Sequence, residues 1–223
     1  MELTFLGHAT WLVRTGGKSL LIDPFLTGNP AATTSADEVS CDFVLISHAH
    51  GDHIGDAEAI LRRTGATAIT TNEIGSELQG KGLDVHPMHL GGKREFPFGS
   101  VKLVLALHGS GIAGGHACGF LIESEGKKLY FAGDTALTTD MQLLRDVWGP
   151  IDIALLPIGS YFTMDADDAA VACRFIAPRT VVPMHYNTFP LIEVDIDHFK
   201  TRVAKESPST EVVVMAPGTS RTF

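Results

Sequence analysis

Short apolar runs separated by glycine-containing turns occupy the first 23 residues. Apolar and polar side chains alternate there, and the pairs Gly7-His8 and Gly16-Gly17 interrupt the runs. This alternation predicts a meander of short strands over residues 2–23. The segment from Gly28 to Cys41 is small, polar and without periodicity, which indicates a surface loop.

From residue 43 onward, apolar runs of strand length alternate with segments of helical periodicity. The spacing predicts strands at 43–46, 66–70, 96–107, 120–132, 153–156, 181–183 and 212–215. It predicts helices at 56–64, 73–79, 140–147, 165–176 and 196–205. Many early strands with interspersed helices indicate a layered α/β domain with its sheets in the middle.

Length and cysteine usage set the wider frame. A chain of 223 residues is ample for a large core, so we expect one domain over residues 1–223 that needs neither disulfides nor oligomerisation to fold. Three separated cysteines, Cys41, Cys118 and Cys173, favour a reduced compartment and buried apolar roles. No export signal and no apolar run of about 20 residues is visible. We therefore expect a cytoplasmic protein without a transmembrane segment.

The charge balance bears on partners. The chain has 17 basic and 26 acidic side chains, a formal charge of −9, and ten histidines. Duplex nucleic acid requires a basic face, which this sequence lacks. We expect a small-molecule substrate, which can be anionic if bound metal reverses the local charge, and no nucleic-acid partner.

Four metal-ligand side chains lie within six positions directly after the apolar run at 43–46. They are His48, His50, Asp52 and His53. Alternate residues of an extended segment point the same way, so His48 and His50 can bind one ion. Asp52 and His53 lie beyond the turn at Gly51, where they can reach a second ion. The spacing suits two adjacent metal ions.

Three further ligand-type residues each follow an apolar run. His108 follows 101–107, Asp134 follows 129–133, and His185 follows 181–184. Active sites gather at the carboxyl ends of strands, because strand ends hold loops rigidly around a common crevice. We therefore predict His108, Asp134 and His185 as metal ligands together with the earlier four.

In this order the motif resembles the metallo-β-lactamase superfamily, and the resemblance covers essentially the whole chain. Further segments resemble its branch of small metal-dependent hydrolases, which is related to the ascorbate-phosphate lactonases and more distantly to the N-acyl-phosphatidylethanolamine phospholipases D. They are Leu6-Gly7-His8-Ala9-Thr10, Leu21-Ile22-Asp23-Pro24-Phe25, Leu156-Pro157-Ile158-Gly159 and Met184-His185-Tyr186-Asn187-Thr188-Phe189-Pro190.

The resemblance implies an αββα sandwich with metals at one sheet edge. It assigns His48, His50 and His108 to the first metal. It assigns Asp52, His53 and His185 to the second, with Asp134 bridging the two ions. One departure is that Gly109 and then Ser110 follow the third histidine, where the family often has Ser, which puts a serine contact to substrate in doubt.

Imidazole and carboxylate suit Zn²⁺ and also Mn²⁺, Fe²⁺ or Ni²⁺. We expect two divalent ions as cofactors, with Zn²⁺ the first choice. Two such ions lower the pKa of a shared water, so hydroxide is the expected nucleophile and no Ser or Cys nucleophile is required. Asp52, Asp134 and His8 are the expected catalytic residues.

Residues near these loops receive supporting roles. His8, in a Gly-His turn, is a candidate for substrate contact or proton transfer. Asp23 follows an apolar run and is expected to orient a ligating histidine. Tyr161, Asn187 and Thr188 are candidates for orienting substrate.

The leading functional hypothesis is a dinuclear hydrolase of an ester-like bond, either a lactone or another carboxylic ester or thioester. A phosphodiesterase similar to the phospholipases D is the alternative within hydrolysis. A non-catalytic metal-dependent binding or sensing protein is the alternative of a different class, because one fold hosts several functions.

Overall fold

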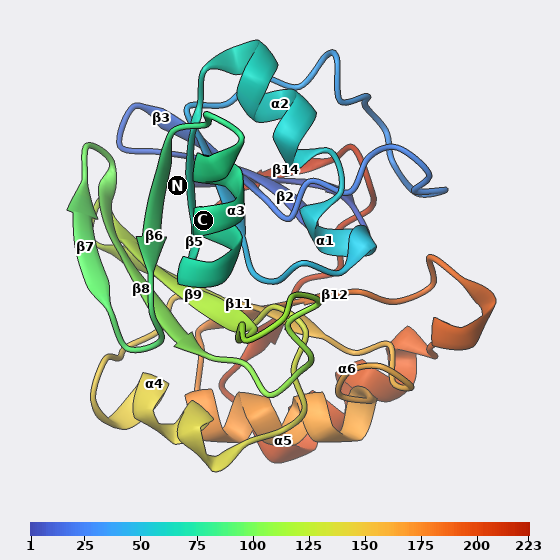
Figure 1. Cartoon of the computed structure of the whole chain (residues 1–223). Helices are drawn as coiled ribbons and strands as arrows, with labels where there is room; N and C mark the ends of the chain where they lie inside the picture. The colour runs from blue at the N-terminus through green and yellow to red at the C-terminus, as the bar shows by residue number, and fades with distance from the viewer.

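Two seven-stranded β-sheets lie face to face in the computed structural model, which describes residues 1–223 (Figure 1). The first sheet has the order β14-β1-β2-β3-β4-β5-β6, with β1 at Glu2–Gly7, β2 at Thr10–Thr15, β3 at Lys18–Ile22, β4 at Phe43–Ile46, β5 at Thr67–Thr71, β6 at Val85–Met88 and β14 at Ser220–Thr222. The second has the order β13-β12-β11-β10-β9-β8-β7, with β7 at Lys93–Phe96, β8 at Gly99–Leu105, β9 at Cys118–Ser124, β10 at Lys127–Phe131, β11 at Ile153–Pro157, β12 at Thr180–Met184 and β13 at Glu211–Val212.

Each sheet joins an antiparallel meander to a parallel half. In the first sheet β1, β2 and β3 pair antiparallel, whereas β3 to β6 pair parallel. The tight turn between β2 and β3 uses Gly16 and Gly17, whose positive φ angles of 56° and 70° are the conformation that such a hairpin turn requires. The second sheet repeats the arrangement, with β7 to β10 antiparallel and β10 to β13 parallel.

Helices cover the outer face of each sheet (Figure 1). The first sheet carries α2 at Ala57–Thr64 and α3 at Asn72–Gly80, with the single turn α1 at Gly51–Ile54 nearby. The second carries α4 at Gln142–Asp146, α5 at Ala166–Ile176 and α6 at Ile196–Glu206. Short 3₁₀ turns, η1 at Thr139–Met141 and η2 at Pro190–Ile192, complete the elements.

Three apolar cores hold these layers together. Trp11, Phe120 and Phe131 belong to the central core between the sheets. Ile60 belongs to the core under α2 and α3, and Ala169 to the core under α5 and α6. The layers therefore stack as helix, sheet, sheet and helix, which confirms the predicted αββα architecture.

Most predicted elements are present, and the differences have local causes. The predicted strand at 96–107 corresponds to β8, whereas β7 lies before it and was missed except for Phe96. The predicted strand at 120–132 divides into the hairpin β9–β10. The predicted strand over 212–215 is wrong beyond Val212, although the backbone N–H of Val213 still donates to Val181 O at 2.9 Å. The edge strands β6 and β14 were not predicted, because β6 contains Pro87 and β14 is polar and exposed.

All three cysteines are buried and free of disulfides, as predicted. None of the helices has the length and apolar character that a membrane crossing requires.

The strand directions bring the predicted site together. In the first sheet β1, β3 and β4 run in the same direction. In the second sheet β8, β10 and β12 run in the same direction. His8, Asp23, His48, His108, Asp134 and His185 follow the carboxyl ends of these six strands in turn. Residues more than 170 positions apart thus reach one edge of the sandwich.

Candidate metal centre

Three imidazoles form the first half of the site. His48 Nε2 lies 3.0 Å from His50 Nδ1, and His108 Nε2 lies 3.2 Å from the same atom. Zinc bound tetrahedrally by imidazoles at 2.0–2.1 Å holds its nitrogen ligands roughly 3.3 Å apart. Both distances are close to that spacing, and ligand atoms of the three residues all lie within 4.8 Å of one another.

The second half contains one more residue than predicted. Ligand atoms of His8, Asp52, His53 and His185 all lie within 4.8 Å of one another. His53 and His185 present nearly parallel rings, with centroids 5.6 Å apart. Sequence reasoning placed His8 beside the metals as a catalytic candidate, whereas the structure places its ring within the ligand cluster.

The Asp134 carboxylate lies between the two halves. Its Oδ1 is 3.3 Å from His53 Nε2, and its Oδ2 is 3.2 Å from His185 Nε2. The same Oδ2 is 3.6 Å from His108 Nε2 of the first half. Gly133 permits this position because its φ is +63° and a Cβ there would lie 2.7 Å from Cys118 O. The carboxylate therefore lies within reach of histidines from both halves of the site.

Buried polar atoms without partners support a metal ion at this site. His53 Nε2, Asp134 Oδ1 and His185 Nε2 are buried and make no hydrogen bond in the structure. Leaving such atoms unsatisfied is costly, by about 1–3 kcal/mol or more for each group. Imidazole nitrogen and carboxylate oxygen together are the donor set of Zn²⁺, Mn²⁺, Fe²⁺ and Ni²⁺. The residues present therefore fit a divalent metal.

Asp23 aligns two of the histidines from behind. His53 Nδ1 donates to Asp23 Oδ2 at 2.7 Å, and the Ser47 backbone N–H donates to Asp23 Oδ1 at 2.7 Å. The Ser47 hydroxyl donates to the same carboxylate at 2.5 Å, so its oxygen is free to accept from His48 Nδ1 at 2.9 Å. Both imidazoles thereby turn Nε2 toward the site. Sequence reasoning anticipated Asp23 in this position but missed Ser47, whose only signal was its place directly before His48.

His8 connects the two sheets across the site. Its Nε2 donates to Asp52 Oδ2 at 3.2 Å, and its Nδ1 lies 3.0 Å from the Thr188 hydroxyl. Its carbonyl oxygen accepts from the backbone N–H of His185 at 2.8 Å. Phe25 and Phe189 enclose its ring, with centroids 5.7 and 5.6 Å away. These two aromatic residues were not singled out from the sequence.

Several site residues have left-handed backbone conformations. His8, Asp23 and His185 have φ angles of 59°, 46° and 55°. Such conformations cost about 1–3 kcal/mol each and persist where the surroundings impose them, commonly at functional sites. All three residues belong to the candidate site at one edge of the sandwich.

The pKa values divide the cluster into a neutral and a protonated part. Burial lowers the pKa of His48 to about 2, of His8 to about 4, and of His108 below its usual value. Burial also acts on His53 and His185, but nearby carboxylates, chiefly Asp134, outweigh it. They raise the pKa of His185 to about 9 and that of His53 well above its usual value.

The predicted substrate-orienting residues differ in their contacts. Thr188 contacts His8, as described, whereas the Asn187 amide accepts from the Val194 backbone N–H at 2.7 Å and closes a local loop. Tyr161 is 72% exposed and is not part of the ligand cluster. The Ser110 hydroxyl donates to Ile112 O at 2.6 Å, so it is engaged within its own loop.

The αββα fold and this strand-end cluster of histidine and aspartate define a protein of the metallo-β-lactamase superfamily. Residues 2–185 match the family described as "Beta-lactamase superfamily domain". Two relatives named UPF0173 metal-dependent hydrolases are similar over the full chain. The one from Heliobacterium modesticaldum is 50% identical and covers 100% of this chain and 98% of its own. The one from Symbiobacterium thermophilum is 49% identical and covers 100% of both.

Solved structures agree with this assignment. A metallo hydrolase from the archaeon Ignicoccus hospitalis is 39% identical, with a TM-score of 0.92 over 100% of this chain and 97% of its own. An isothiocyanate hydrolase from Delia radicum gut bacteria shares the fold alone, at 19% identity and a TM-score of 0.79 over 100% and 99%. The chain belongs to the UPF0173 metal-dependent hydrolases, and it is a metal-dependent enzyme. This favours the hydrolase over the sensing protein.

The link through Asp23 yields a test of metal affinity. Replacing Asp23 with Asn removes the charge that orients His53 and Ser47, so we expect metal affinity to fall by about 10- to 100-fold. Competition with a chromophoric chelator measures this change. Asp42→Asn is the matched control, since Asp42 binds Ser19 and Lys18 away from the cluster. Equal affinities in the two variants would contradict the role of Asp23.

Metal loading should release protons. At pH 7 the metal-free protein keeps the added protons of His53 and His185, whose pKa values are raised, whereas His48 and His108 are neutral. We expect about two protons to leave His53 and His185 per chain at pH 7, in addition to one for each bound water that ionises, and fewer as the pH rises through the pKa of His185. Calorimetric titration in buffers of different ionisation enthalpy counts them, with His198→Gln on exposed α6 as control. Release near zero at pH 7 would be inconsistent with these shifts.

Proposed function

We propose that this enzyme uses two divalent metal ions to hydrolyse an ester-like bond, either a lactone or another carboxylic ester or thioester. His48, His50 and His108 would hold one ion, and Asp52, His53 and His185 the other. The observation that carries the proposal is the position of Asp134, whose Oδ2 lies 3.2 Å from His185 and 3.6 Å from His108. A carboxylate between two histidine groups suits two ions better than one.

When bound, such ions act as Lewis acids and supply hydroxide from water at neutral pH. Zn²⁺ is our first choice among the ions that fit the donor set. No serine or cysteine nucleophile is needed, and all three cysteines are buried.

The chain's own residues fix the charge and the proton positions around the reacting centre. The Asp52 pKa lies well below its usual range because the neighbouring imidazoles of His185 and His8 outweigh its burial. Neutral His8 keeps its proton on Nε2, where it donates to Asp52 and holds that carboxylate in one orientation. We assign His8 as a positioning residue that can also pass a proton at Nε2.

The surroundings of His8 favour a substrate with an apolar part. A cavity of about 370 Å³ borders His8 and is lined mostly by apolar residues, among them Phe5, Tyr186 and Met215, and by no lysine or arginine. The strand-end loops also expose Phe162 and Leu191, at 54% and 61%. A basic recess would have favoured phosphorylated substrates. These features support an uncharged ester or lactone.

Activity against a small panel of substrates tests the proposal. We expect the metal-loaded enzyme to hydrolyse an alkyl lactone and a short-chain thioester faster than a phosphodiester. Asp134→Asn should lower kcat by at least about 100-fold, because even residues behind the ligands affect activity by 10–100-fold. Asp84→Asn is the control and should retain activity, because Asp84 accepts a hydrogen bond from Thr67 at the start of β5 and is not part of the cluster.

Two results would overturn the proposal. The metal role fails if chelator-treated enzyme or Asp134→Asn keeps full activity. The ester assignment fails if the phosphodiester is the fastest substrate.

A further inference from the structure

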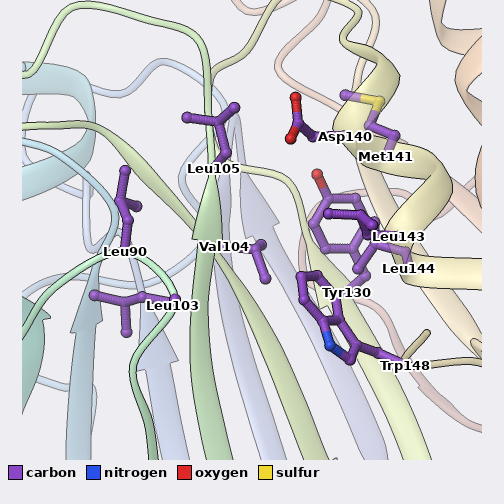
Figure 2. Close-up of a pocket in the computed structure, with 11 residues that line it drawn as sticks. Leu90, Leu103, Val104, Leu105, Tyr130, Asp140, Met141, Leu143, Leu144 and Trp148 are labelled. Carbon is purple, nitrogen blue, oxygen red and sulfur yellow. The ribbon is translucent and has the colours of Figure 1, made fainter.

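A second cavity lies on the outer face of the second sheet, outside the metal cluster. It has a volume of about 300 Å³ and is bounded by β8, β10 and the segment that contains η1 and α4 (Figure 2). Nine of its eleven lining residues are apolar, and none of the eleven belongs to the ligand cluster. Leu105 and Leu143 border it and are each 39% exposed, so solvent reaches this apolar surface.

One polar group in the wall of this cavity is a tyrosine hydroxyl. Tyr130 is 1% exposed, and its hydroxyl forms no hydrogen bond with the protein. Figure 2 shows this hydroxyl directed toward the end of the cavity where Asp140 and Met141 lie. Burial raises the pKa of Tyr130, so the hydroxyl keeps its proton and can donate. A hydroxyl that faces an apolar cavity can donate to the polar group of a ligand bound there.

Asp140 supplies the complementary acceptor at the same end. Its carboxylate lines the cavity and has no ion-pair partner in the protein. Trp148 lies at the opposite end in Figure 2 and has Lys102 Nζ 4.9 Å from its ring centroid. The cavity thus combines a long apolar wall with one donor and one acceptor close together.

We propose that this cavity binds a medium-chain aliphatic alcohol, with its chain along the leucines and its hydroxyl between Tyr130 and Asp140. A hydroxyl accepts and donates at once, whereas a carboxylate would face the negative charge of Asp140. At about 30 Å³ for a group the size of a water molecule, the cavity of about 300 Å³ holds about ten such groups, so a chain of about eight carbons fits. This binding site goes beyond the proposed hydrolysis and does not depend on it.

Tryptophan fluorescence can detect the ligand, because Trp148 borders the cavity whereas Trp11 is buried between the sheets. We expect saturable changes on titration with 1-octanol, and weaker binding of octanoate, whose carboxylate would face Asp140. Tyr130→Phe should weaken 1-octanol binding by about 2- to 10-fold, the value of one hydrogen bond, and leave octylammonium binding unchanged. Trp148→Phe should remove the signal, and equilibrium dialysis of that variant should still show binding.

Filling the cavity gives an independent check. Leu105→Trp should abolish saturable binding, whereas Leu191→Trp, at an exposed position outside the cavity, should not. Circular dichroism shows whether each variant is folded. Three results would overturn the proposal: no saturable binding by the wild-type protein, binding by folded Leu105→Trp equal to wild type, or binding of octanoate as tight as that of 1-octanol.

Discussion

The enclosed carboxylate of Asp134 is the constraint on which the rest of the site depends. A carboxylate with almost no solvent contact requires positive charge nearby, and the imidazoles of His53 and His185 lie 3.3 and 3.2 Å from its two oxygens. In the metal-free protein these rings supply the charge by holding protons. A divalent ion bound by the same histidines would supply that positive charge instead. The residues that stabilise the Asp134 carboxylate are therefore also suited to binding a metal ion.

The scaffold makes this arrangement possible by aligning strand ends from two sheets. β4, β10 and β12 end at one edge of the sandwich, and their following residues face one another without long flexible connections. The Asp23–Ser47 link then holds His48 and His53 in a single tautomer. The hydrogen bond from His185 N–H to His8 O joins the two sheets at the same level. Precision at the site therefore comes from rigid strand ends and buried hydrogen bonds.

Most of the candidate metal ligands and the strands before them could be predicted from the sequence, because their signals are local. The run from His48 to His53 and the apolar segments before His108, Asp134 and His185 are each visible in a few residues, and the family resemblance orders them. The contact of His8 with Thr188 joins residues 180 positions apart, and no local pattern encodes it. Edge strands such as β14 were missed because their pairing satisfies backbone groups while their side chains remain exposed. The apolar cavity beside Tyr130 also depends on long-range packing.

The central claim is that two ions flank Asp134, and anomalous X-ray scattering from a metal-loaded crystal tests it most directly. The account predicts two peaks: one among His48, His50 and His108, the other among Asp52, His53 and His185, each in contact with Asp134. A single fully occupied peak after saturation with metal, or peaks that do not contact Asp134, would contradict it.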